Sequence, residues 1–299
     1  MSDPSTSDLD GTILWSALLS ETTQRLAASG VSENPRQEAK WILEEVTGTS
    51  GAEFVEAMDG LATVRGVAHL DTMVERRISG EPIQYVLGHW AFRSLDLLVD
   101  RRVLIPRPET EVVAGLAMAE IDRLDRARAS VVDLGTGSGA IGLAIATERP
   151  GTQVVLTDRS EEALAVARAN LAGLGRSGRD VTIHCGEWFA ALPQDRRGTV
   201  DLIVSNPPYI ARHEVLDTSV VDWEPEMALR AGDDGFDDLR VIVREAVHWL
   251  TDDGVLVLEM APGQTADVAE LAEQVGFTAE IYRDVAGLER AVVARRQAS

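Results

Sequence analysis

A glycine-rich loop and an acidic residue that follows it are the first features of this sequence that could carry chemistry. The apolar run Val131–Leu134 leads directly into the loop and then into a helical apolar pattern. The loop reads Gly135-Thr136-Gly137-Ser138-Gly139. Glycines there permit a tight turn and a close approach of a ligand to the backbone. Asp158 ends the next apolar run, where a carboxylate can accept hydrogen bonds from both hydroxyls of a ribose. Together they predict a nucleotide-like ligand.

A second motif, Asn206-Pro207-Pro208-Tyr209, directly follows the apolar run Asp201–Ser205. Ligands bind at such strand ends in open parallel sheets. The prolines remove backbone NH donors, so the Asn206 side-chain oxygen and a neighbouring carbonyl can both accept hydrogen bonds from one NH2 group. Tyr209 offers a flat face for stacking. The motif therefore favours methylation of a planar amino or amide nitrogen.

The chemistry of such a nitrogen explains why acceptors are needed. Its lone pair is delocalised, and paired acceptors on its NH groups would stabilise the positive charge that develops during transfer. Alignment of the nitrogen with the methyl donor supplies much of the remaining advantage. No metal is required, and the single Cys185 and the five scattered histidines lack metal-ligand spacing.

The elements that must position these motifs fall into three predicted parts. Residues 1–80 show apolar stripes at helical spacing, including a helix that begins with Asn34 and Pro35 and stops at Gly48, and no strand-like alternation. We expect a small helical bundle there. Residues 81–110 predict a hairpin and neck, with a turn at Asp100–Arg102 and a second apolar run at Val103–Ile105. Residues 111–299 form the main domain.

Short apolar runs alternate with helical patterns from Ser130 onward. This βαβ series ends in a strand pair, so we expect an α/β fold whose sheet is mostly parallel and covered by helices on both faces.

Composition restricts the class of protein further. The 299 residues are 45% hydrophobic and 26% charged, which is typical of a globular chain. No apolar run approaches the roughly 18 residues that span a bilayer, and the first ten residues do not resemble a signal peptide, so we expect a cytoplasmic protein without membrane contact. A net charge of -21 disfavours direct nucleic-acid binding.

The glycine loop alone is ambiguous, because Gly137 to Gly142 also satisfies the G-x-G-x-x-G pattern of dinucleotide-binding proteins. A NAD-dependent oxidoreductase would leave the motif at Asn206 unexplained. Asp133 followed by three glycines at alternate positions resembles instead the first motif of class I methyltransferases.

Over almost its whole length the chain resembles the protein-(glutamine-N5) methyltransferases of peptide chain release factors, the HemK or PrmC family. Besides the two motifs, the resemblance rests on short segments along the chain: Gln84 to Gly88, Ile105 to Glu111, Glu224-Pro225 with Ala228-Leu229, and Tyr282 to Asp284 with Ala286-Gly287. Glu187 departs from the family pattern, where Asp is common, and so does Gly88-His89-Trp90.

The resemblance implies a Rossmann-like class I methyltransferase fold with a mostly parallel seven-stranded sheet, a helical N-terminal domain that recognises the substrate protein, and a hairpin neck. It also implies methyl transfer from S-adenosyl-L-methionine, which leaves as S-adenosyl-L-homocysteine, to the glutamine of the release factor's Gly-Gly-Gln loop. The predicted cofactor-binding residues are Asp133, Gly135, Thr136, Gly137, Ser138, Gly139, Asp158, Trp188 and Asn206. Catalysis is assigned to Asn206, Pro207 and Tyr209, and substrate binding to these three with Pro208.

Other interpretations remain open at this stage. An adenine-N6 DNA or guanine-N2 RNA methyltransferase would share the clamp on an exocyclic NH2, and a non-catalytic adaptor could retain the fold. Trp188 and Phe189 could be core aromatics rather than adenine contacts. Glu224 and Glu226 are expected to face solvent. The four polar residues of the neck either cap a helix or close the site; they are Arg107, Glu109, Thr110 and Glu111.

Overall fold

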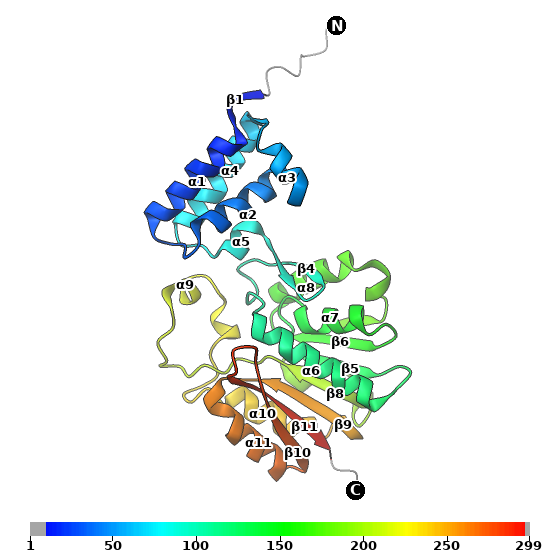
Figure 1. Cartoon of the computed structure of the whole chain (residues 1–299). Coiled ribbons are helices and arrows are strands. Elements are labelled where there is room, and N and C mark those ends of the chain that lie inside the picture. The colour runs from blue at the N-terminus through cyan, green and yellow to red at the C-terminus, as the bar shows by residue number, and fades with distance from the viewer. Residues whose placement is uncertain (1–9, 297–299) are drawn as a thin grey trace. The chain divides into compact units, whose positions relative to one another are not determined.

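The computed structural model describes residues 10–296, and the chain divides into two compact units, one up to Gly88 and one from His89 onward (Figure 1). The first unit contains five helices among its described residues: α1 (Trp15–Ser29), α2 (Pro35–Thr47), α3 (Gly51–Ala57), α4 (Val64–Ile78) and α5 (Ile83–Leu87). It extends beyond the predicted boundary at residue 80 because α5 packs against α2 and α4.

The predicted ends of α2 are confirmed. The Asn34 side chain accepts a hydrogen bond from the Gln37 backbone amide at 3.3 Å, Pro35 occupies the first turn, and Gly48 ends the helix with a left-handed φ of 67°. Asparagine satisfies an otherwise unpaired amide, and glycine adopts positive φ without steric cost.

Two short strands were not predicted in this unit: β1 (Asp10–Leu14) and β2 (Leu61–Thr63). They pair antiparallel, and backbone hydrogen bonds from Trp15 to Gly60 and from Ser16 to Met58 continue the pairing into the start of α1. A three-residue strand is too short to produce a recognisable alternation.

The second unit opens with a hairpin of β3 (His89–Phe92) and β4 (Leu95–Leu98). The predicted turn at Asp100–Arg102 is present, with the Val103 amide donating to the Asp100 carbonyl at 3.0 Å, but it is not the turn of the hairpin. The chain reverses at Arg93, whose φ is 52°, and Val103–Ile105 is irregular rather than a strand. The Ile105 amide donates instead to the Glu224 carboxylate at 3.1 Å, which replaces a strand partner.

Seven strands form one sheet in the order β10-β11-β9-β8-β5-β6-β7. Their bounds are β5 (Ser130–Leu134), β6 (Gln153–Asp158), β7 (Val181–Cys185), β8 (Val200–Ser205), β9 (Leu250–Glu259), β10 (Phe277–Arg283) and β11 (Glu289–Arg296). Only β11 runs antiparallel to its neighbours in this sheet, so the predicted mostly parallel sheet with a terminal strand pair is confirmed.

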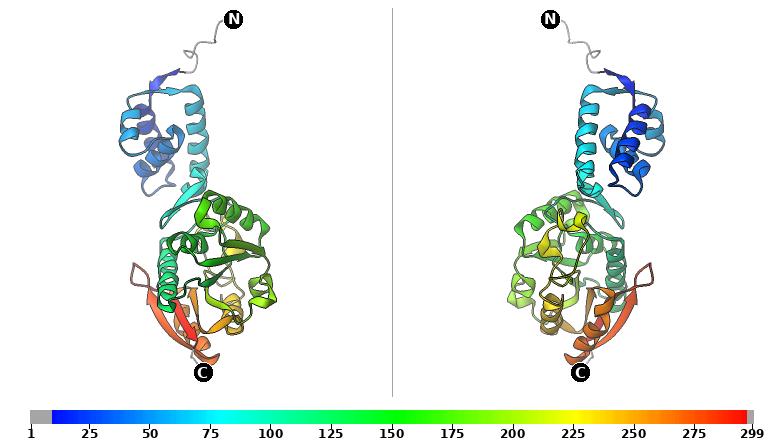
Figure 2. Two further views of the ribbon diagram at one scale, coloured as in Figure 1. Left: turned by 90° about the vertical axis from the view of Figure 1, so that its right-hand side faces the viewer. Right: turned by 90° about the vertical axis from the view of Figure 1, so that its left-hand side faces the viewer.

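Helices cover the sheet from both sides (Figure 2). They are α6 (Pro108–Leu124), α7 (Ala140–Glu148), α8 (Glu161–Gly173), α10 (Asp237–Ala246) and α11 (Thr265–Gln274), with the short α9 (Thr218–Val221) in the connection after β8. Helices α6 and α7 pack on each other, as do α10 and α11. Successive residues of a strand point to opposite faces, so Val132 and Leu134 join the core with α10 and α11, while Asp133 faces α7.

Candidate functional site

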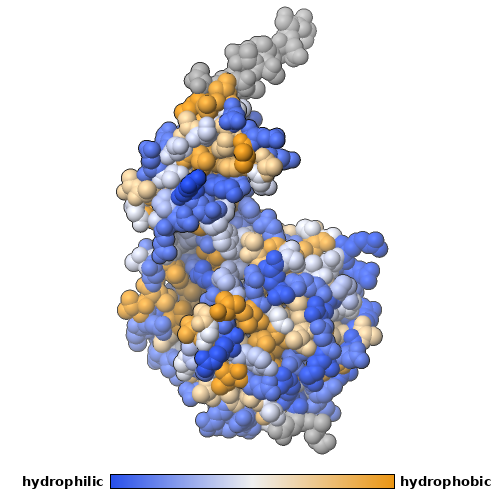
Figure 3. Space-filling view, in the orientation of Figure 1, coloured by the Kyte–Doolittle hydropathy of each residue, from blue (hydrophilic) through white to orange (hydrophobic). Residues whose placement is uncertain are grey.

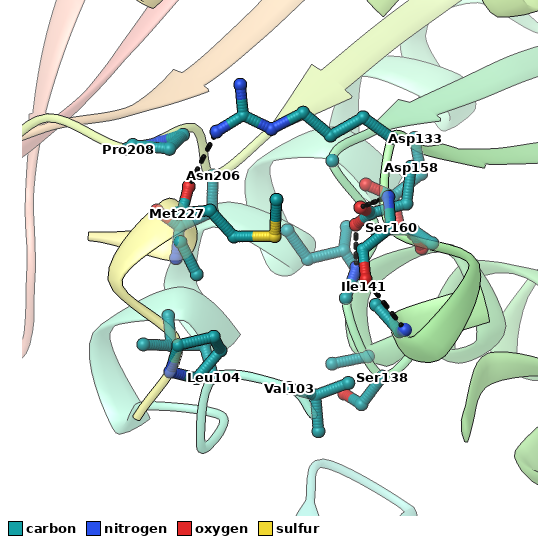
Figure 4. A pocket seen from close by; sticks show the side chains of 18 of the residues that line it. Val103, Leu104, Asp133, Ser138, Ile141, Asp158, Ser160, Asn206, Pro208 and Met227 are labelled. Carbon is teal, nitrogen blue, oxygen red and sulfur yellow. Dashed lines mark hydrogen bonds between the residues drawn. The ribbon is translucent and has the colours of Figure 1, made fainter. Parts of the chain in front are cut away.

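The site lies where three neighbouring parallel strands end. The register pairs Leu134 of β5 with Thr157 of β6 and with Ser205 of β8. Parallel pairing therefore brings together the residues that follow, and a pocket in the second unit is lined by the glycine loop, Asp158 and Asn206 (Figure 4). The crevice at the carboxyl ends of parallel strands is the usual ligand site of such sheets.

The glycine loop requires glycine for its backbone conformation. Gly135, Gly137 and Gly139 have φ values of 70°, 56° and 88°, a region that other residues rarely adopt. The Thr136 amide donates to the Thr157 carbonyl at 2.8 Å, which anchors the loop to β6. The loop then enters α7 directly.

Asp133 supports this loop from the sheet. Its Oδ2 accepts hydrogen bonds from the Thr136 hydroxyl at 2.6 Å and from the Gly142 amide at 3.0 Å. Burial raises the pKa of Asp133 to about 6, and the two hydrogen bonds oppose that rise. A Cβ on Gly142 would lie 2.2 Å from a methyl carbon of Leu156, so glycine there permits the close packing of α7 on β6.

Asp158 connects the loop to the next helix. Its Oδ2 accepts from the Gly137 amide at 3.0 Å and its Oδ1 accepts from the Ser160 amide at 2.9 Å. A carboxylate offers about four acceptor sites, so capacity remains for hydroxyl donors of a ligand. Figure 4 shows Asp158 and Ser160 on one side of the pocket and Asn206 and Met227 on the other.

The neighbouring aromatics Trp188 and Phe189 divide between pocket and core. Phe189 is buried and stacks on Trp249 with ring centroids 5.7 Å apart. Trp188 lines the pocket, and its indole nitrogen donates to Asp238 Oδ1 at 3.1 Å. Burial raises the pKa of Asp238, and the hydrogen bond from Trp188 opposes this. The ring of Trp188 lies against Gly135, where a Cβ would approach it to 3.2 Å.

Asn206 enters the pocket from the end of β8. Its Nδ2 donates to the Thr110 hydroxyl at 3.2 Å, and Thr110 lies in the first turn of α6. Its neighbour Ser205 donates to the Leu134 carbonyl at 2.6 Å, which ties the two strand ends together. An oriented amide in the pocket wall can present its oxygen to an NH donor.

The pocket is lined by nine of the twelve residues that the sequence assigned to the site; Gly139, Pro207 and Tyr209 are the others. Tyr209 is partly buried and packs against the core, and burial raises the pKa of its hydroxyl to about 12. Its carbonyl accepts from the Gln264 side chain at 3.0 Å.

The expectation that Glu224 faces solvent was wrong, whereas Glu226 is exposed as expected. Glu224 is only 5% exposed because it accepts from the Ile105 amide and forms an ion pair with Arg107. These bonds connect the neck before α6 to the segment after α9. Arg107 immediately precedes α6, so it belongs to the helix start and also lines the pocket.

The prediction did not assign the remaining pocket wall to the site. Part of this wall comes from the neck and from the segment after α9, namely Arg102, Val103, Leu104, Pro106, Pro225, Met227 and Ala228. The rest follows the strand ends, namely Ala140, Ile141, Arg159, Ser160, Ala163, Gly186 and Glu187. Pro106, Pro225 and Ala228 fall within segments that carry the family resemblance, which is the signal that could have identified them. Asp238, which holds Trp188, has no such signal.

Across residues 10–296 no group of three or more His, Cys, Asp or Glu could hold a metal ion. Within the same range no helix is both long enough and apolar enough to cross a membrane.

The methyltransferase small domain family matches residues 116–223, and the PrmC N-terminal domain family matches residues 17–88. With the strand order and the glycine loop, the first match defines the second unit as a class I methyltransferase domain.

Curated relatives cover nearly the whole chain. The release factor glutamine methyltransferase of Rhodospirillum rubrum is 37% identical over 295 residues, which is 97% of this chain and 87% of the relative. The release factor glutamine methyltransferase of Coxiella burnetii is 38% identical over 268 residues, which is 89% of this chain and 94% of the relative. The chain belongs to the release factor glutamine methyltransferase family.

A solved structure shares the fold alone. The hMettl16 catalytic domain in complex with MAT2A 3'UTR hairpin 6 matches with a TM-score of 0.52 and 13% identity, over 79% of this chain and 84% of that one.

Proposed function

We propose that this protein transfers a methyl group from S-adenosyl-L-methionine to the side-chain amide nitrogen of the glutamine in the Gly-Gly-Gln loop of peptide chain release factors. The observation that carries the proposal is that one pocket contains both the glycine loop with Asp158 and the amide of Asn206. The relatives from Rhodospirillum rubrum and Coxiella burnetii carry the name of this activity over almost the same length of chain. Because release factors act in translation termination, the proposal implies a cytoplasmic enzyme.

The residues of the pocket fit an adenosyl cofactor. Asp158 retains acceptor capacity for ribose hydroxyls, and the half-buried ring of Trp188 provides a flat surface beside Gly135. The glycine loop, with Ser138 and buried Ile141, would hold the rest of the molecule close to backbone. When bound, S-adenosyl-L-methionine supplies an electrophilic methyl group on a sulfonium and becomes S-adenosyl-L-homocysteine.

Asn206 is proposed to hold the glutamine amide. Because its nitrogen donates to Thr110, its oxygen is the end of the amide that faces a substrate NH. That oxygen would fix the direction of the glutamine nitrogen and stabilise the charge that develops on it. Pro207 and Pro208 are buried and carry no backbone NH donor that could compete with the substrate for the Asn206 oxygen. Tyr209, through its packed ring and anchored carbonyl, would fix the backbone of the clamp.

A protein substrate suits the surface better than a polyanion. The net charge of the chain is -21, which opposes nucleic-acid phosphates. The segment between β8 and α10, which contributes Pro225, Met227 and Ala228 to the pocket wall, exposes Val215, Val221 and Met227. Figure 3 shows apolar patches among hydrophilic side chains on this part of the second unit. Exposed apolar side chains gathered on one segment are typical of a surface that contacts another protein. We assign the first unit to recognition of the same substrate protein.

The experiment offers labelled S-adenosyl-L-methionine with purified release factor, with its Gly-Gly-Gln to Gly-Gly-Ala variant, and with DNA and RNA in parallel. Label on the wild-type release factor alone, with the mass gain of one methyl group on the loop glutamine, is the expected result. Label on DNA or RNA would favour the adenine-N6 or guanine-N2 alternative instead, and would overturn the proposed substrate while retaining the cofactor.

A further inference from the structure

Trp188 has an unusual backbone conformation for a residue with a large side chain. Its φ is 45°, and it begins the short 3-10 helix η3 (Trp188–Ala191) that follows β7. The other non-glycine residues with positive φ among residues 10–296 are Arg93, in the hairpin turn, and Asp125, which ends α6. A bulky residue in the left-handed region costs free energy and persists only where its surroundings hold it.

The Trp188 ring is held at both ends. Its indole nitrogen donates to Asp238 Oδ1 at 3.1 Å. At the other end of the ring, Cζ3 and Cη2 lie against Gly135, where an added Cβ would approach them to 3.2 and 3.6 Å. The indole therefore spans the distance between α10 and the glycine loop, and the two contacts together fix its direction.

Asp238 forms the rigid end of this arrangement. It lies in the first turn of α10, which buries Leu239, Ile242 and Val243 in the core. Asp238 is partly buried and does not line the pocket, whereas Trp188 does. A hydrogen bond that ends on a carboxylate is stronger than one between neutral groups. Asp238 is therefore placed to act on a ligand through Trp188 rather than by contact.

We propose that Asp238 is a positioning residue that holds the Trp188 ring in the pocket wall before the cofactor binds. The inference rests on the proposed function, because the ring matters as the flat surface for the adenine of S-adenosyl-L-methionine. A ring that is fixed in advance loses no rotamer freedom on binding, so more of the contact energy is realised as affinity. Without Asp238 the indole NH loses its acceptor and the ring regains other directions, and affinity falls.

The first test needs no ligand. The chain contains six tryptophans, so labelling with nitrogen-15 tryptophan gives six indole NH signals in NMR spectra of the full-length protein. Trp188→Phe identifies the Trp188 signal by its loss. Because a hydrogen bond to a carboxylate moves an NH proton downfield, Asp238→Ala should shift this signal upfield. Asp238→Asn, which retains an acceptor oxygen, should shift it less.

Asp237→Ala is the matched control. Asp237 lies in the same turn of α10 and carries the same charge, but it is exposed and pairs with Arg240 at 3.5 Å. Its replacement should leave the Trp188 signal in place. Unshifted signals from the other tryptophans show that each variant is folded. A Trp188 signal that stays in place in Asp238→Ala, or that shifts equally in Asp237→Ala, would overturn the inference.

The second test measures the Kd for S-adenosyl-L-methionine by calorimetry. Asp238→Ala should weaken binding by about 10-fold, and Asp238→Asn and Asp237→Ala by less than about 3-fold. In a Trp188→Phe background, Asp238→Ala should change the Kd by less than about 2-fold, because phenylalanine has no NH to hold. An equal loss in both backgrounds would mean that Asp238 supports α10 rather than Trp188, and would overturn the inference.

The results separate this inference from the proposed function. If the wild-type protein does not bind S-adenosyl-L-methionine, the proposed function fails, and the indole signals still decide whether Asp238 positions Trp188. If the wild-type protein binds it and methylates release factor while Asp238→Ala binds with equal affinity, only the positioning role fails. At saturating cofactor, Asp238→Ala should keep kcat within about 3-fold of wild type, since the clamp at Asn206 is unchanged.

Discussion

The backbone amide of Gly137 donates a hydrogen bond to Oδ2 of Asp158 at 3.0 Å, which ties the turn after β5 to the end of β6. The other carboxylate oxygen holds the Ser160 amide ahead of α8. Asp158 therefore has two connected roles, since it shapes the glycine loop and faces the ligand that the loop would hold.

Replacing Asp158 with alanine should weaken binding of S-adenosyl-L-methionine by at least about 10-fold, since both the ribose acceptor and the loop contact are lost. Isothermal titration calorimetry measures this directly. Asp195→Ala, which removes an exposed carboxylate outside the pocket, is the matched control and should bind normally. Unchanged affinity in Asp158→Ala would refute the assignment.

Asn206→Ala should reduce methyl transfer by orders of magnitude while changing cofactor affinity much less, because the lost oxygen acts on the substrate nitrogen during the reaction. Single-turnover rates and calorimetry on the same preparation separate the two effects. Equal losses of rate and affinity would show that Asn206 acts on the cofactor instead.

Gly135→Ala combines two penalties: a left-handed φ of 70° and a Cβ placed 3.2 Å from the ring of Trp188. Its control is Gly48→Ala, where φ is 67° but no atom lies within 4 Å of the added carbon. Both variants should lose about 1 kcal/mol of unfolding free energy. Only Gly135→Ala should also lose affinity for S-adenosyl-L-methionine, and equal affinities would mean that the position of Trp188 does not matter.

The strands of the sheet were predictable because each is a short apolar run. The residues of the site were predictable because they follow those runs. Gly135, Asp158 and Asn206 all come directly at or after a strand end, so parallel pairing alone brings them together. The hairpin turn was mistaken because the apolar run Val103–Ile105 resembles a strand, while its actual partner, Glu224, lies 119 positions later.

Buried charged residues were the least predictable part of the site. Glu224 and Glu259 look like ordinary surface acids in the sequence, because acidic residues are rarely buried. Their burial arises only when distant segments meet. The same holds for the hydrogen bond between Asn206 and Thr110, which are 96 positions apart.

The division into two compact units predicts what a shortened chain can do. Every residue that lines the pocket belongs to the second unit, which also has its own core. A chain that begins at His89 should bind S-adenosyl-L-methionine within about 3-fold of the full-length affinity but lose at least about 10-fold in kcat/KM for release factor. Full-rate methylation by the shortened chain would exclude the proposed role of the first unit.

Glu259→Gln should change how stability depends on pH. Burial raises the pKa of Glu259 from 4.5 to about 7, so the folded protein holds this proton more tightly than the unfolded chain. The free energy of unfolding of the wild-type protein therefore falls as the pH rises between these values, and Glu259→Gln, which cannot ionise, lacks this loss.

Relative to wild type, the free energy of unfolding of Glu259→Gln should increase by up to about 3 kcal/mol between low pH and about pH 8. Asp133, whose pKa is also raised by burial, is present in both proteins and cancels in the difference. Denaturant unfolding across this pH range measures the effect. Parallel pH profiles for the two proteins would mean that Glu259 is not a buried titrating carboxyl.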